Sequence, residues 1–118
     1  MTTTRHDIEI IRGDSRALFV GLADDWVDLD EGVGAYEGRL VFRERQEDNL
    51  PELLVITSPI EVATDPRYPA LKYLLDFSMT PVETQSLPDY PVVYFIELRL
   101  TDETFVRRLV EGRVKRRD

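Results

Sequence analysis

The sequence contains no cysteine and a single histidine, and these shortages exclude several kinds of chemistry. Without thiols the chain forms no disulfide, holds no metal through thiolates and has no cysteine nucleophile. The one histidine, His6, lies near the start of the chain, and no serine is spaced around it in a pattern typical of a catalytic triad. We therefore expect a fold stabilised by packing alone, with no catalytic residue and no enzymatic activity.

Long apolar runs are also missing, and positive charge is in the minority. No segment approaches the roughly 18 apolar residues of a membrane-spanning helix, and the first residues hold no apolar run typical of a signal peptide. The 23 acidic residues exceed the 15 basic ones, and the resulting charge of −8 repels nucleic-acid phosphates and anionic lipid heads. We expect a soluble protein, made and kept in the cytoplasm, that binds neither nucleic acid nor membrane.

The strongest structural signal is the segment 90–100. Apolar side chains occupy every second position, and the other face changes from Val93 and Phe95 to Glu97 and Arg99. A period of two fits only a β-strand. We expect this strand in the middle of a sheet, with Tyr94 and Ile96 buried and the second face covered near Val93.

Six further runs have strand character and are separated by turn signals. They span 7–12, 16–22, 38–44, 52–57, 70–77 and 105–114. The run 52–57 is continuously apolar, which predicts burial on both faces, whereas helix competes with strand over 70–77. Gly112 predicts a β-bulge. The proline-rich stretch 58–69 predicts little regular pairing.

One short helical turn is predicted between two of these strands. Thr80 is suited to cap a helix, Pro81 suits its first position and Glu83 completes a capping box. Seven short strands with at most one helical turn predict an all-β fold, an antiparallel immunoglobulin-like β-sandwich. We expect one domain over 1–118, with flexible tails at 1–6 and 115–118.

The candidate metal site is the acidic segment from Asp24 to Glu31. Oxygen-rich loops suit calcium, but an EF-hand loop counted from Asp28 would have Gly32 at its fifth position and Val33 at its sixth, so the required order fails. We interpret the segment as a solvated loop, and we expect no metal and no cofactor.

Two other features suggest contacts with partners. The tripeptide Arg12-Gly13-Asp14 occurs in some integrin-binding adhesins, but a Gly-Asp pair after a strand is ordinary turn chemistry. Trp26, Tyr36 and Tyr68 lie in segments expected to be irregular, and aromatic side chains are enriched in interfaces. We predict these three aromatic residues as partner-binding residues.

Several segments together resemble one family, the N-terminal domain of upper baseplate and tail-fibre adaptor proteins of bacteriophages. The matching segments are 7–14, 27–29, 39–43, 75–84, 87–90, 94–98 and 112–114. They correspond to an arginine-glycine-acid opening, a valine-aspartate-leucine, a threonine-rich turn before a strand motif of the type tyrosine-x-tyrosine-glutamate-leucine, and a closing glycine-x-valine. The chain departs from the family at Pro91 and Val92, in the proline-rich stretch 58–69, and in lacking a fibre segment after Asp118.

The resemblance implies a structural virion protein of a phage tail or baseplate, located in the virion and assembled in the host cytoplasm. Its partners would be other tail or baseplate proteins, in a homo-oligomer or a large assembly, with no catalysis. The alternative function is a stand-alone binding module, for example a carbohydrate-binding sandwich. That alternative requires two or three coplanar exposed aromatic side chains.

Calcium should not stabilise the chain if the acidic loop is merely solvated. Thermal melting in millimolar calcium and in chelator should then give the same midpoint. A ligand that binds only the folded state raises the melting temperature, so a clear upward shift in calcium would contradict this prediction.

Overall fold

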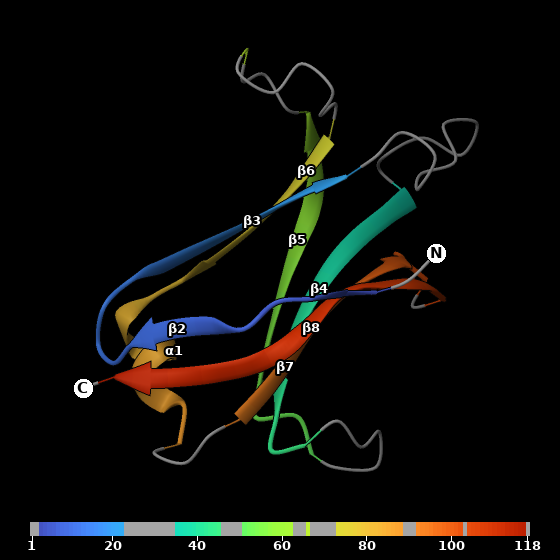
Figure 1. Cartoon of the computed structure of the whole chain (residues 1–118). Coiled ribbons are helices and arrows are strands. Elements are labelled where there is room, and N and C mark those ends of the chain that lie inside the picture. The colour runs from blue at the N-terminus through green and yellow to red at the C-terminus, as the bar shows by residue number, and fades with distance from the viewer. Residues whose placement is uncertain are drawn as a thin grey trace.

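The computed structural model describes residues 3–22, 35–45, 51–62, 66, 73–88, 92–102 and 104–117. Strands dominate it, with one short helix (Figure 1). The elements are β1 (Thr4–Arg5), β2 (Ile8–Ile11), β3 (Arg16–Leu22), β4 (Tyr36–Arg43), β5 (Leu54–Val62), β6 (Tyr73–Met79), α1 (Pro81–Ser86), β7 (Val92–Leu100) and β8 (Phe105–Arg117).

The strands form one curled sheet in the order β1-β8-β7-β4-β5-β6-β3, and β2 also pairs with β8. The all-β prediction is confirmed. A single curled sheet does not confirm the immunoglobulin-like sandwich, and β1 and β2 run parallel to β8 where only antiparallel pairs were expected. These parallel pairs join the two ends of the chain. Because no tight turn connects parallel strands, no local sequence signal predicts them.

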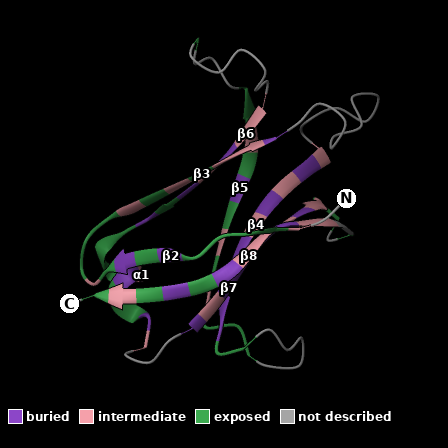
Figure 2. Cartoon of the chain, viewed as in Figure 1, coloured by how far each residue is buried: buried purple, intermediate pink, exposed green. Residues whose placement is uncertain are grey.

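The core lies on the inner face of the curl. It is built from alternate residues of the long strands, and the buried bands recur along β4 and β7 in Figure 2. β7 lies between β8 and β4, and Tyr94 and Ile96 are buried, so the prediction for this strand is confirmed. β6 is a strand, which decides against the helical alternative, with Leu75, Phe77 and Met79 buried on one face.

The helix α1 begins as predicted. The Thr80 side chain accepts a hydrogen bond from the Glu83 backbone N–H, and the Glu83 carboxylate accepts one from the Thr80 N–H. Thr84 then fastens the helix to the β2–β3 turn: its Oγ1 accepts from the Gly13 N–H at 3.2 Å and donates to the Asp14 carbonyl at 2.8 Å. Gly13 adopts φ 83°, which favours glycine. The Arg-Gly-Asp segment is therefore part of the turn between β2 and β3, and hydrogen bonds to Thr84 hold this turn against the helix.

The prediction for 52–57 was wrong in two respects. Val55 is 36% exposed and Thr57 is exposed, so the strand is not buried on both faces, and β5 continues to Val62. It pairs with β4 as far as Pro59 and with β6 from Ile60 onward. Proline has no N–H to donate, and it sits where the strand changes partner. The Ser58 hydroxyl accepts from the Asp76 N–H at 3.0 Å, which bridges the change.

Gly112 is not a bulge. It pairs in register with Tyr94, and the register shifts of the β7–β8 ladder fall farther along, between Ile96 and Arg99. Glycine is required there because a Cβ would overlap the carbonyl oxygen of His6, where the chain crosses β8 between β1 and β2. The Tyr94 hydroxyl donates to that carbonyl. Burial, with a smaller effect of Asp7, raises the pKa of Tyr94 to about 12, so the hydroxyl keeps its proton.

The predicted flexible tails are also corrected. Residues 115–117 belong to β8, where Lys115 and Arg116 pair with Glu9 and Ile10, and Thr4–Arg5 forms β1. Backbone pairing between the two ends explains their order. We use the term N-terminal strap for residues 4–11.

Gly112→Ala should destabilise the chain by displacing the N-terminal strap. Overpacking costs about 1 to 3 kcal/mol, measurable as a lower midpoint of urea unfolding. The same substitution should cost much less in a chain shortened to begin at Ile8, which lacks His6. An equal cost in both backgrounds would show that the strap is not what requires glycine.

Candidate interaction surface

The three aromatic residues predicted to bind partners do not form one described surface. Trp26 and Tyr68 lie outside the described residues. Tyr36 begins β4, is 6% exposed and belongs to the core, so it offers little area to a partner. Partner binding by these three residues stays a prediction.

The outer face of the sheet, opposite the core, carries a second and smaller buried layer. Val41 and Phe95 are neighbours across β4 and β7, and both are buried although neither belongs to the core cluster. Two arginines cover the Phe95 ring: the guanidinium carbon of Arg43 lies 5.1 Å from its centroid and that of Arg108 lies 4.1 Å away. Such cation–π contacts stabilise by about 0.5–1 kcal/mol where water is near.

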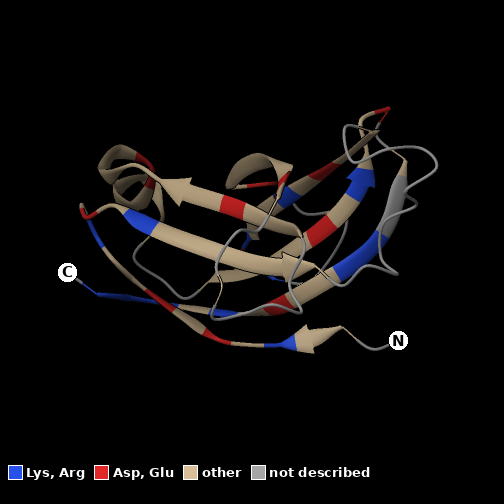
Figure 3. Cartoon of the chain, turned by 90° about the horizontal axis from the view of Figure 1, so that it is seen from above, with Lys and Arg blue, Asp and Glu red and all other residues tan. Residues whose placement is uncertain are grey.

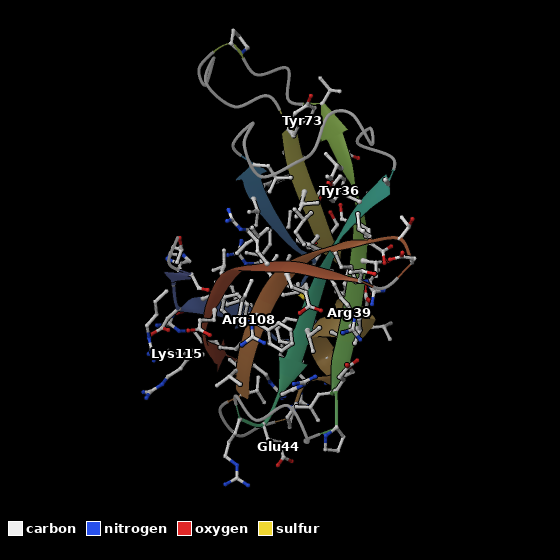
Figure 4. The ribbon with its side chains drawn as sticks, turned by 90° about the vertical axis from the view of Figure 1, so that its right-hand side faces the viewer. Tyr36, Arg39, Glu44, Tyr73, Arg108 and Lys115 are labelled. Carbon is white, nitrogen blue, oxygen red and sulfur yellow. The ribbon has the colours of Figure 1, made fainter. Side chains whose placement is uncertain are left out.

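Ion pairs extend this layer along the strands, and blue and red bands alternate on the ribbon in Figure 3. Arg99 Nε lies 2.6 Å from Glu37 and Arg39 lies 3.5 Å from Glu97, so two β4–β7 pairs that are neighbours on this face join opposite charges. Figure 4 views this side of the molecule, where Arg39 and Arg108 are labelled. Cross-strand pairs of this kind contribute roughly 0.2–1 kcal/mol each.

Glu52 connects the two arginines of β4. Its carboxylate lies 2.6 Å from Arg39 and 3.5 Å from Arg43. The hydrogen bond from Arg39 lowers the pKa of Glu52, with further help from the charges of Arg39 and Arg43, against the opposing effect of burial. On this face, the charged side chains of β4 and β7 are therefore engaged with one another and with Glu52.

A second feature is an open groove between α1 and the β2–β3 turn. It has a volume of about 510 Å³ and is lined by Gly13, Pro81, Val82, Gln85 and Ser86. Val82 is strongly exposed on its rim. The lining offers a ligand apolar contact and few charged groups.

The two edges of the sheet differ in a way that bears on function. The edge formed by β1 and β2 is broken into pieces of two and four residues. Asp7 lies between them, and its carboxylate accepts from the Arg113 N–H at 2.9 Å. Glu9 makes an ion pair with Arg117 at 3.1 Å. Short, interrupted and charged edges resist pairing with other chains.

The opposite edge, β3, is neither short nor interrupted. It runs for seven residues, Arg-Ala-Leu-Phe-Val-Gly-Leu, and pairs with β6 without a register shift. Among the described strands β6 is its only partner. Its one charge, Arg16, stands at the first position and donates to the Ala17 carbonyl at 3.1 Å. Phe19, in the middle, is 65% exposed.

This edge is the candidate site, and sequence reasoning did not identify it. Phe19 alternates with Leu18 and Val20 along the strand, and its face is exposed. The available signal was an aromatic side chain in the middle of a strand whose only charge is at its first position. What the sequence did not show is that β3 ends the sheet, because strand order depends on contacts distant along the chain.

The described residues offer little to a cofactor. In that part of the chain no three His, Cys, Asp or Glu side chains gather as a metal site, and the acidic segment 24–31 lies outside it. No helix there is long and apolar enough to cross a membrane. Comparison with protein-family models finds no match, and comparison with curated proteins finds no similar sequence.

Glu52→Gln tests the outer-face network. A carboxylate whose pKa is lowered by folding stabilises the fold above its unfolded pKa, about 4.5, and this stabilisation disappears as the pH falls through the folded pKa. The variant should therefore lose about 1 kcal/mol of unfolding free energy near neutral pH and match the parent in acid. Glu61→Gln, which removes the same charge from an exposed position, should change little at either pH. Equal losses by Glu52→Gln at both pH values would contradict the proposed role.

Proposed function

We propose that the chain is a structural subunit of a bacteriophage tail or baseplate, which attaches fibres or neighbouring subunits through protein–protein contacts. The observation that carries the docking role is the edge of β3, which pairs only with β6 among the described strands and exposes Phe19 at its centre. A long edge strand with its only charge at one end offers backbone N–H and C=O groups to an added strand. The immunoglobulin-like arrangement is not needed for this role.

The phage setting rests on the resemblance of the sequence, and two contacts support treating the matching segments as one unit. Thr84, in the threonine-rich segment, bonds to Gly13 and Asp14 of the opening segment. Tyr94, in the strand motif, pairs with Gly112 of the closing segment. Residues distant in sequence but named by the same resemblance therefore touch in the fold.

The carbohydrate-binding alternative has less support on the described surface. It requires several coplanar exposed aromatic rings, whereas Phe19 is the one exposed aromatic side chain among those described. Tyr94 and Phe42 contact each other inside the core, and Phe95 is covered by arginines. A single exposed ring on a strand edge suits a protein partner better than a sugar.

Co-expression with the products of the adjacent genes tests the proposal. The chain should co-purify with at least one tail or baseplate protein as a stoichiometric complex. Trp26→Ala and Tyr68→Ala should leave the chain folded and weaken the complex by about 2 kcal/mol or more, roughly thirtyfold, if either side chain is a central anchor. Val62→Ala, at an exposed position on β5, is the control.

Two results would contradict this proposal. One is a chain that binds no neighbouring gene product. The other contradicts only the role of the aromatic anchors. If fluorescence reports a fully buried Trp26 indole in the free protein, Trp26 is a core residue and has no surface for docking.

A further inference from the structure

We propose that β3 pairs with β3 of a second copy of the chain, antiparallel and across a twofold axis that passes between the two Phe19 residues. This inference deepens the proposed function by naming the partner at the β3 edge. The twofold axis stands perpendicular to the sheet, so the curled sheets of the two copies join into one continuous sheet.

The register follows from the alternation of faces. Residues directly opposite each other in a sheet lie on the same face, so a self-pairing has to match outward with outward positions. Centring on Phe19 does this and uses all seven residues of the strand. Centring on Leu18 or Val20 also matches the faces but leaves two residues of each strand without a partner.

The side chains are complementary in this register. Phe19 faces Phe19 of the second copy, and Ala17 faces Gly21 on either side, so two rings meet with only small outward neighbours beside them. Aromatic cross-strand pairs stabilise sheets, and an aromatic ring beside glycine restores the packing that glycine lacks. On the inner face Leu18 meets Val20, which continues the apolar core of each copy.

Charge does not oppose the contact locally. The only charge of the strand, Arg16, falls opposite Leu22, at the ends of the pairing. On β6, Asp76 stands beside Phe19 and is bonded to Ser78, one strand removed from the new junction. The net charge of −8 repels two copies at longer range, and salt screens such repulsion. Association should therefore strengthen as ionic strength rises, the opposite of a contact driven by charge attraction.

The chain contains no cysteine, so single cysteines report on this register without background. Directly opposite Cα atoms in an antiparallel pair lie about 4.5–5.5 Å apart, within the range of a disulfide. Phe19→Cys should therefore form a disulfide-linked dimer under mild oxidation. Ala17→Cys is the matched control, because its two copies would lie roughly 13 Å apart along the strands, beyond disulfide reach.

Phe19→Lys and Phe19→Glu test the same contact without oxidation. Each places like charges opposite each other at the axis, and each should be monomeric in sedimentation at concentrations where the parent associates. An equal mixture of the two variants should recover the dimer, since lysine then faces glutamate. Val62→Lys adds the same charge at a similarly exposed position, 67% against 65%, and should associate like the parent.

The outcomes separate this inference from the proposed function. Faster cross-linking of Phe19→Cys than Ala17→Cys, by roughly tenfold or more, together with rescue in the mixture, supports self-pairing. A parent that is monomeric at every concentration and salt level, or equal cross-linking of the two cysteine variants, overturns it. A monomer that still binds a neighbouring gene product would overturn self-pairing alone, and a dimer that binds none would overturn the proposed function alone.

Discussion

A single sheet has to bury its own apolar face, and this constraint shapes the rest of the described structure. The one described helix has six residues, which is too short to cover the inner side chains of β4, β6 and β7. The sheet therefore curls until its strands pack across the concave side. Twist and curl come naturally to strands of this length, but curling without closure leaves two edges. How those edges are treated distinguishes this fold from an ordinary open sheet.

One edge of the sheet, β8, is covered by the N-terminal strap of the same chain. The N-terminal strap lies along β8, fills the core with Ile8 and Ile10, and crosses at the one place where Gly112 leaves room for the His6 carbonyl. The Tyr94 hydroxyl bonds to that carbonyl from the adjacent strand. The Tyr94 side chain, Gly112 and the N-terminal strap thus depend on one another. The β2–β3 turn then leads to the other edge, and Thr84 holds that turn against α1.

Local signals predicted the parts of the fold that local chemistry determines. The period of two identified β3, β6 and β7, and the capping box located α1, because alternation and capping involve residues close in sequence. The course of β5 past Ser58 was missed because Pro59 normally ends pairing, and here it marks a change of partner. The strap and the role of Gly112 were missed because they join residues about a chain length apart. For the candidate site, alternation separates Phe19 from Leu18 and Val20 in the sequence but does not show that its face is exposed or that β3 is terminal.

The contrast between outer face and edge explains which surface remains for a partner. On the outer face of β4 and β7, the charged side chains are matched within the chain, Glu37 by Arg99 and both Glu52 and Glu97 by Arg39, and two guanidiniums cover the Phe95 ring. Docking there would require exchanging internal contacts for external ones, with little net gain. At β3 less has to be given up: water on Phe19 and on the edge backbone, and the hydrogen bond that Arg16 donates to the Ala17 carbonyl at the start of the strand. A partner strand replaces that water with backbone hydrogen bonds and apolar contact, so we expect assembly to occur at the β3 edge.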